Sequence, residues 1–97
     1  MTSSPLDLTL YVAGRSPRAE RALQNLQRLL DHRGIPFEVE VVDVLDRPDL
    51  AEKALILATP TLLRNNPLPP RRLIGDLSDT AVVLHSLQLD PEAGELP

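Results

Sequence analysis

The sequence has no cysteine and no tryptophan among its 97 residues, and Tyr11 and Phe37 are its two aromatic side chains. The lack of cysteine excludes disulfide bonds, thiolate metal ligands and every kind of thiol chemistry. The shortage of aromatics means that the core must be built from Leu, Val, Ile and Ala. No apolar run reaches transmembrane length, and the N-terminal MTSSPLD lacks the basic flank and apolar stretch of a signal peptide. A cytoplasmic protein of one domain is therefore expected.

Positive charge is scarce, because ten basic residues against fourteen acidic ones give a net charge of −4. This balance argues against a general nucleic-acid-binding protein, which needs a basic surface. Five arginines fall between Arg15 and Arg33, whereas the acids concentrate in residues 38–49 and in the tail. A molecule with one basic and one acidic side is one interpretation, and ordinary solvated charges are the other.

Apolar periodicity in the first half of the chain predicts a strand followed by a helix. Residues 8–13, LTLYVA, are typical of a buried strand, which ends at Gly14. Ser16 and Pro17 are typical of a helix start, and Gly34 of a helix end. Between them the apolar residues repeat every three or four positions, which predicts one apolar helix face formed by Ala19, Ala22, Leu23, Leu26, Leu29 and Leu30.

The rest of the chain completes a thioredoxin-like pattern. Residues 37–45 predict a second strand, parallel to the first because a helix connects them. We expect a short helix after Asp46, strands near 61–64 and 72–74, and a last helix capped by Asp76 or Ser78. The resulting order, βαβαββα, is that of a thioredoxin-like α/β fold. The expected organisation is an N-terminal extension (1–5), the domain (6–89) and an acidic tail (90–97) too poor in apolar side chains to order itself.

Three stretches of the sequence resemble one known family. They are LYVAG at residues 10–14 with Ser16-Pro17, the segment from Asp43 that ends in ILATPTL at 56–62, and RRLIGDLS at 71–78. In this order and spacing they are similar to the KaiB family of circadian-clock proteins, over residues 6–89. The second and third stretches together make the resemblance specific.

The resemblance implies a regulatory protein without enzymatic activity or cofactor. KaiB binds the hexameric ATPase KaiC, helps to recruit KaiA, and competes with a sensor kinase that carries a similar thioredoxin-like domain. The family is metamorphic: a ground-state βαββααβ fold forms dimers or tetramers, and a thioredoxin-like fold binds partners. The order of elements predicted here is that of the second fold.

The same resemblance singles out five candidate partner-binding residues. Arg21, Arg71 and Arg72 match arginines of KaiB proteins, and they would form one basic surface. Charges that keep an edge strand from aggregating are the alternative explanation. Glu40 and Leu55 stand where KaiB proteins typically carry a basic residue, which predicts a change in association rate and partner choice.

Three further residues are candidates for controlling the choice of fold. Ser86 and Gln88 replace the Gly and Asp typical of the family, and both are expected inside a last helix that runs from Asp79 to Leu89. There they would favour the helix by about 1 kcal/mol, so a thioredoxin-like, largely monomeric protein is predicted. Pro60 stands at the cis-proline position of thioredoxin-like folds, with the cis and trans forms both open.

No catalytic, cofactor-binding or metal-binding residue is predicted. Ser16 stands where thioredoxins carry Cys-x-x-Cys, and a helix cap accounts for it. His32 and His85 lack metal-ligand spacing. The first hypothesis is a KaiB-type binding module for a KaiC-like ATPase and its KaiA-like or sensor-kinase regulators. The second is a paralogue serving another regulator or a stress response, and a thioredoxin-superfamily enzyme that uses Ser in place of Cys is less favoured.

Overall fold

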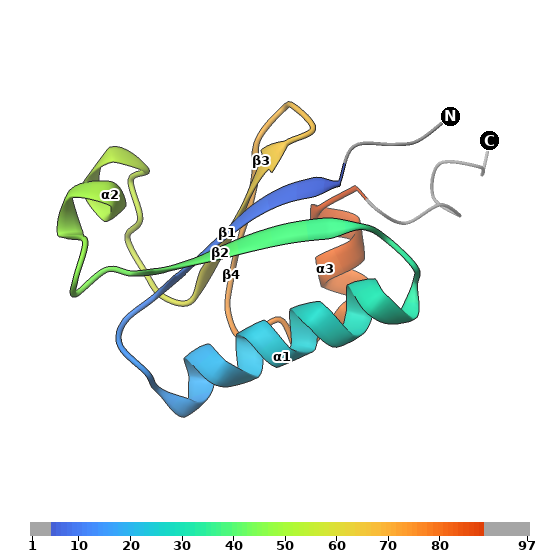
Figure 1. Ribbon diagram of the computed structural model, residues 1–97, viewed down its shortest axis with the longest axis horizontal. Coiled ribbons are helices and arrows are strands. Elements are labelled where there is room, and N and C mark those ends of the chain that lie inside the picture. The colour runs from blue at the N-terminus through green and yellow to red at the C-terminus, as the bar shows by residue number, and fades with distance from the viewer. Residues whose placement is uncertain (1–4, 89–97) are drawn as a thin grey trace.

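One mixed four-stranded sheet organises the described part of the chain, and the elements follow the predicted order βαβαββα (Figure 1). The computed structural model describes residues 5–88. Its elements are β1 (Leu6–Val12), α1 (Pro17–His32), β2 (Phe37–Asp43), α2 (Pro48–Lys53), β3 (Thr61–Asn66), β4 (Arg71–Ile74) and α3 (Thr80–Ser86). Over this part of the chain, no helix has the length and apolar character needed to cross a membrane.

The strands lie in the order β2-β1-β3-β4. β1 is parallel to β2, as the strand–helix–strand pattern predicts, and antiparallel to β3, which forms an antiparallel hairpin with β4. Side chains alternate between the two faces of a strand, so one face carries Leu8 and Leu10 of β1 beside Val39 and Leu62. Tyr11 lies on the opposite face.

α1 and α3 pack against the leucine-rich face of the sheet (Figure 1). α1 begins at the predicted cap, where Ser16 Oγ accepts a hydrogen bond from the backbone N–H of Ala19 at 3.1 Å. It ends before Gly34, whose φ of +67° favours glycine. The core between these layers contains one aliphatic cluster: Leu6, Leu8, Leu10, Val12, Ala19, Ala22, Leu26, Leu30, Leu62, Leu77, Val83 and Leu87.

α2 lies beside the sheet rather than over it. It belongs to residues 44–60, here called the α2 lobe, which extend to one side of the molecule (Figure 1). None of the residues of α2 is buried. Leu45, Leu55 and Leu57 of the lobe are 70%, 69% and 95% exposed, so the lobe presents large apolar side chains to its surroundings.

β2 ends two residues earlier than predicted, at Asp43 instead of Leu45. The carboxylate of Asp43 accepts hydrogen bonds from the backbone N–H groups of Gly14 and Leu45, each at 2.9 Å. These bonds satisfy the backbone locally and turn the chain into the α2 lobe, so the apolar run cannot continue as a strand.

α3 begins later than predicted. Asp79 caps it, because Asp79 Oδ1 accepts a hydrogen bond from the backbone N–H of Val82 at 3.2 Å. Neither of the two predicted caps, Asp76 and Ser78, takes this role. Asp76 Oδ1 instead accepts a hydrogen bond from the Ser78 N–H at 3.1 Å, which makes a turn before the helix.

α3 also ends earlier than predicted, at Ser86. Leu87 is fully buried and caps the helix, and Gln88 adopts a left-handed conformation with φ of +59°. The expectation that Gln88 lies inside the helix is therefore wrong. The helix is capped at the buried Leu87, and the left-handed backbone of Gln88 does not continue it. The predicted acidic tail, residues 90–97, lies outside the described residues.

Candidate partner-binding surface

Ser16 sits at the N-terminus of α1, where a thioredoxin would carry its redox motif. Its Oγ accepts the hydrogen bond from Ala19 described above, so the hydroxyl serves as a helix cap. Pro60 immediately precedes β3 and follows a cis peptide bond, and its carbonyl oxygen accepts a hydrogen bond from the Gly75 N–H at 2.9 Å. The cis form is thus the one present in this fold.

The histidines lie at separate helix ends. His32 is in the last turn of α1 and His85 in the last turn of α3, so the two side chains lie on different helices. Within residues 5–88, no cluster of three or more His, Asp or Glu side chains has the arrangement needed to hold a metal ion.

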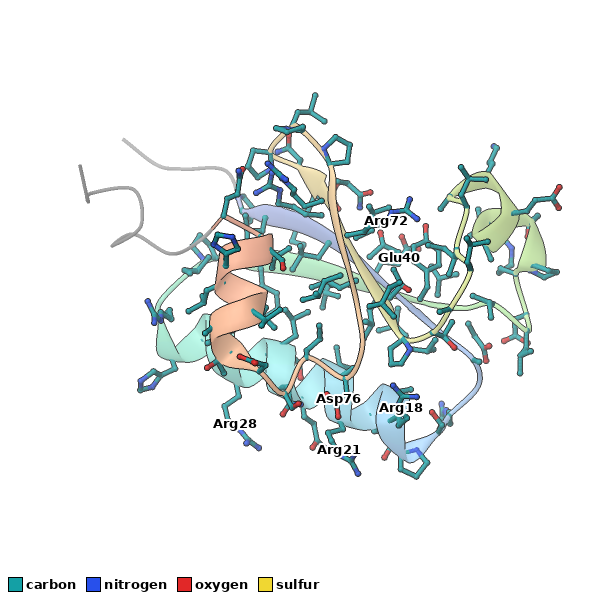
Figure 2. All side chains as sticks on the ribbon, turned by 180° about the vertical axis from the view of Figure 1, so that it is seen from behind. Arg18, Arg21, Arg28, Glu40, Arg72 and Asp76 are labelled. Atoms are coloured by element: carbon teal, nitrogen blue, oxygen red, sulfur yellow. The ribbon has the colours of Figure 1, made fainter. Side chains whose placement is uncertain are left out.

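One row of side chains crosses the whole sheet on the face turned away from α1 and α3, here called the second face. The register pairs Glu40 of β2 with Thr9 of β1, Thr9 with Leu63 of β3, and Leu63 with Arg72 of β4. Neighbouring strands are about 4.8 Å apart, so the backbone positions of the acid and the base are roughly 14 Å apart at the two edges. Figure 2 shows Glu40 and Arg72 on this face. The second face therefore has an acidic edge and a basic edge.

Arg72 connects the basic edge to the α2 lobe. Its Nη1 donates to the carbonyl oxygen of Leu55 at 3.0 Å, and its Nη2 donates to the carbonyl oxygen of Ala54 at 2.8 Å. Both acceptors lie in the turn that follows α2, where backbone carbonyls lack partners within the helix. The predicted residues Arg72 and Leu55 are thus adjacent, and the Leu55 side chain is exposed beside them.

Tyr11 lies between the two edges, and charges on both edges influence the pKa of its phenol. The side chain is 7% exposed, and burial raises the pKa of its phenol. The carboxylate of Glu40 raises that pKa further, whereas the guanidinium of Arg72 lowers it. Glu40, Tyr11 and Arg72 therefore share one electrostatic environment.

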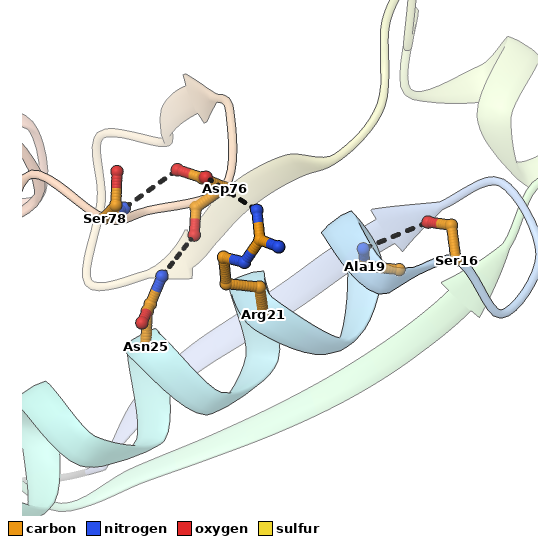
Figure 3. A network of polar contacts seen from close by, with 6 residues as sticks. All are labelled: Ser16, Ala19, Arg21, Asn25, Asp76 and Ser78. Atoms are coloured by element: carbon orange, nitrogen blue, oxygen red, sulfur yellow. Dashed lines mark hydrogen bonds and ion pairs between the residues drawn. The ribbon is translucent and has the colours of Figure 1, made fainter.

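Arg21 and Arg71 do not join this surface. Arg21 lies on the outer side of α1, where its Nη1 is 3.8 Å from the carboxylate of Asp76 (Figure 3). Arg71 and Arg72 are consecutive residues of β4, so their side chains lie on opposite faces of the sheet. The single basic surface expected from the three arginines is therefore not formed.

The arginines of α1 form a second charged region. Arg18, Arg21 and Arg28 are exposed along this helix, on the other side of the sheet from Glu40 (Figure 2). Glu38 lies two residues from Glu40 in β2 and therefore on the same face as Glu40. This placement agrees with the interpretation of a basic and an acidic side.

The sequence analysis assigned no role to two residues, Tyr11 and Arg64, whose surroundings in the structure are unusual. Tyr11 was assigned to a buried strand, and its link to Glu40 depends on a register that the sequence alone does not give. Arg64 was placed in a short strand without a role, yet it is 3% exposed. Its signal was its spacing of two from Leu62, which places Arg64 on the same face of β3 as that buried leucine.

The fold and this surface define a thioredoxin-like domain that carries a helix-capping serine in place of redox thiols. The KaiB domain model matches residues 9–89, and the chain belongs to the KaiB family. The resemblance stated from the sequence is thereby confirmed.

Curated relatives support the same assignment. The chain is 51% identical over 84 residues to the circadian clock oscillator protein KaiB of Synechococcus elongatus, covering 84% of this chain and 81% of that protein. It is 40% identical over 93 residues to the circadian clock protein KaiB3 of Synechocystis sp., covering 95% and 91%.

Solved structures confirm the predicted fold class. The N-terminal domain of Synechococcus elongatus SasA matches with a TM-score of 0.75 and 25% identity, covering 92% of this chain and 86% of that domain. Mitochondrial thioredoxin 3 from Saccharomyces cerevisiae matches with a TM-score of 0.68 and 18% identity, covering 90% and 81%. The second match concerns the fold alone.

Proposed function

We propose that this chain is a non-catalytic regulatory module of a circadian clock, which docks on a KaiC-like ATPase and its associated regulators. The observation that carries the proposal is the 51% identity to a circadian clock oscillator protein KaiB over 84 residues. The likeness to the N-terminal domain of SasA adds support, because a second protein of that organism shares the shape.

The docking surface in this proposal is the basic edge of the second face together with the α2 lobe. Arg72 supplies an exposed guanidinium, and Leu45, Leu55 and Leu57 supply exposed apolar side chains. Arginine is enriched at binding hot spots, and the leucines beside it would exclude water from the contact. Arg21 would contribute from a separate surface, on α1.

The absence of catalysis in this proposal is supported by the use of Ser16. Its Oγ already accepts the capping hydrogen bond of α1. The sequence also has no cysteine that could replace it as a nucleophile. The capping role is sufficient to explain a serine at this position, without a catalytic role.

A second candidate function is a KaiB-like protein for another regulator or a stress response. Glu40 and Leu55 favour it, because both positions differ from the basic residues typical of the family. Glu40 is exposed at the acidic edge, so a partner that expects a lysine there would meet a like charge.

The ground-state fold and its dimers or tetramers remain part of the proposal. The thioredoxin-like form would be the partner-binding monomer, with Pro60, Ser86 and Gln88 as residues that influence the balance. Ser86 is the last residue of α3, and Gln88 lies two residues later in a left-handed conformation. In this proposal, the stability of that helix end would influence the balance between the two folds.

Capture of a KaiC-type hexameric ATPase on immobilised protein tests the clock function. We expect retention by the parent, about tenfold weaker retention by Arg72→Glu at low salt, and a smaller difference at high salt, because exposed charges are screened. Arg28→Glu on α1 is the matched charge-reversal control. Arg72→Lys keeps the charge and should retain most of the binding.

The double variant Glu40→Lys, Leu55→Lys separates the two candidate functions. If the clock function is right but the interface has drifted, this variant should capture a cyanobacterial KaiC at least tenfold more strongly than the parent. Failure of both the parent and this variant to bind would favour the paralogue that serves another regulator.

A further inference from the structure

A groove of about 350 Å³ lies between α1 and the loop that leads into α3, and it is here called the α1 groove. Its walls are formed by Asn25, Arg28, Leu29 and His32 of α1, by Leu77 and Ser78 of the loop, and by Thr80 at the start of α3. The volume is near the lower limit of ligand pockets, which measure about 300–1,000 Å³. The α1 groove therefore suits a ligand of the size of one or two amino-acid side chains.

The α1 groove combines an apolar floor with two basic side chains on one wall. Leu77 is a buried member of the core cluster, and the half-buried Leu29 packs against that cluster. Arg28 and His32 are four residues apart in α1, so they lie one above the other on the same side of the helix, and both are exposed. A ligand with both apolar and negatively charged parts would match this lining.

The acids of the loop do not neutralise this wall. The carboxylate of Asp76 lies 3.8 Å from Arg21, one turn or more before the groove, and the carboxylate of Asp79 caps α3. The ion pairs described within residues 5–88 include neither Arg28 nor His32. The α1 groove therefore presents basic side chains that are available to a ligand.

The loop wall of the α1 groove is attached to α1 before any ligand binds. Asn25 Nδ2 donates to the carbonyl oxygen of Asp76 at 2.9 Å, and Arg21 is paired with the carboxylate of the same residue (Figure 3). Asp76 Oδ1 in turn accepts a hydrogen bond from the Ser78 N–H at 3.1 Å. Binding to a site whose walls are already ordered avoids the entropic cost of fixing a loop.

We propose that the α1 groove docks an acidic segment of a partner protein. Carboxylates of this segment accept charge-assisted hydrogen bonds from Arg28 and His32, and one apolar side chain of the segment lies over Leu29 and Leu77. Ser78 and Thr80, both exposed on the opposite wall, supply hydroxyl groups to the segment's backbone. Two basic side chains above an apolar floor suit a peptide better than a nucleic acid, which needs a broad basic surface.

The α1 groove is separate from the docking surface of the proposed function. That surface consists of Arg72 and the α2 lobe, and Arg72 lies on the face of the sheet turned away from α1. The groove proposal therefore does not depend on the clock function, and one molecule has room for two partners at once.

Titration of the nitrogen-15-labelled protein with a synthetic peptide, Asp-Glu-Asp-Leu-Asp-Glu, tests the proposal. We expect saturable shifts of the backbone amide signals of residues 25–32 and 77–80. The same peptide with serine in place of leucine is the comparison probe. It should bind about fivefold more weakly, because it lacks the apolar side chain that would be partly buried in the groove.

Two variants remove the peptide's contacts from opposite walls. Arg28→Glu should weaken binding at least tenfold, because the peptide then meets a like charge. Thr80→Glu should also weaken binding, and it leaves α3 folded because an acid in the first turn of a helix is favourable. Circular dichroism checks that both variants keep the parent's secondary structure.

Arg18→Glu is the matched control for Arg28→Glu. It makes the same change of charge on the same helix, and ten residues place it about 15 Å from Arg28 along the axis, outside the groove (Figure 2). This variant should keep most of the parent's affinity for the peptide.

Four results would overturn the proposal. The first is a parent whose groove signals do not shift saturably with the peptide. The second is equal weakening by Arg28→Glu and Arg18→Glu, which would mean that net charge alone attracts the peptide. The third is equal affinity for the leucine and serine peptides, which would mean that the groove holds no apolar side chain. The fourth is stronger binding of a short oligouridylate to the same residues, which would identify a nucleic acid as the ligand.

Discussion

Arg21 of α1 and Asp76, in the loop after β4, are joined by an ion pair of 3.8 Å (Figure 3). A second contact reinforces the first, because Asn25 Nδ2 donates to the carbonyl oxygen of Asp76 at 2.9 Å. Asp76 also accepts a hydrogen bond from the Ser78 N–H within its own loop. The loop that leads into α3 is therefore attached to the first helix of the protein.

Asp76→Asn is expected to remove a pH-dependent part of the stability. Hydrogen bonds from the Ser78 side chain and backbone, with a smaller contribution from Arg21, hold the pKa of Asp76 below its ordinary 3.8. A depressed pKa stabilises the fold above the ordinary value, and this contribution is lost as pH falls through the lower value of the folded state. Urea midpoints measured from pH 6 to pH 2 should fall less steeply for Asp76→Asn. The exposed Asp31→Asn serves as the control, and equal slopes for all three proteins would contradict the prediction.

Ser16→Ala should cost about 1 kcal/mol of stability, because the first turn of α1 loses its capping hydrogen bond. Ser16→Asp should stay close to the parent, since its carboxylate can accept the same bond. Urea unfolding provides the comparison. The parent should also fail to reduce insulin disulfides or to conjugate glutathione, and turnover that vanishes in Ser16→Ala would instead establish a catalytic serine.

Gln88→Gly should stabilise the thioredoxin-like form by about 1 kcal/mol, because a left-handed backbone carries a steric cost for any residue with a Cβ. For a domain of this size that shift raises Tm by roughly 4–8 °C. Gln88→Ala keeps the Cβ and is the control.

Ser86→Gly acts in the opposite direction from Gln88→Gly. It lies within α3, where glycine is less favourable than serine by about 0.5 kcal/mol. Thermal unfolding combined with a sizing column would report both stability and assembly. If Gln88→Gly and Gln88→Ala melt at the same temperature, the left-handed conformation of residue 88 is not a source of strain.

Alkaline titration of Tyr11 should report on the two edges of the second face. It is the single tyrosine of a sequence without tryptophan, so its absorbance change is unambiguous. Glu40→Gln should lower the pKa of Tyr11, and Arg72→Gln should raise it, because each change removes one of the two opposing charges.

The same titration has a consequence for stability. Burial raises the pKa of Tyr11 in the folded protein. The contribution of its neutral phenol to stability is therefore complete below the ordinary tyrosine pKa of 10.0. It is lost as pH rises through the raised value of the folded protein. A pKa of Tyr11 that does not move in either variant would show that the register places these charges too far from the ring.

Local sequence signals were sufficient for most of the architecture. Ser16, Pro17 and Gly34 determine α1 through backbone chemistry within a few residues, and the structure has it at Pro17–His32. The limits of α3 were missed because two tertiary effects decide them: the Asp76 turn moves the cap to Asp79, and the burial of Leu87 accompanies the helix end.

The candidate surface was only partly predictable for a related reason. Family likeness identified the arginines, but strand alternation separates Arg71 from Arg72, and a sequence match carries no information about which face a residue takes. The row from Glu40 to Arg72 required the pairing of four strands. Two of the three pairings join residues more than thirty positions apart, and the third lies within the β3–β4 hairpin.

Arg72 also couples the α2 lobe to the β3–β4 hairpin. Its guanidinium is a donor to two carbonyls of the lobe, so any event that draws β4 away from β3 leaves those carbonyls without it. Leu57, 95% exposed in the lobe, offers a position for a fluorescent label. Because the natural sequence contains no cysteine, a Leu57→Cys variant would take a thiol-reactive dye at that one position. The fluorescence of this dye would then report rearrangements of the β3–β4 hairpin, although the labelled residue lies outside the hairpin.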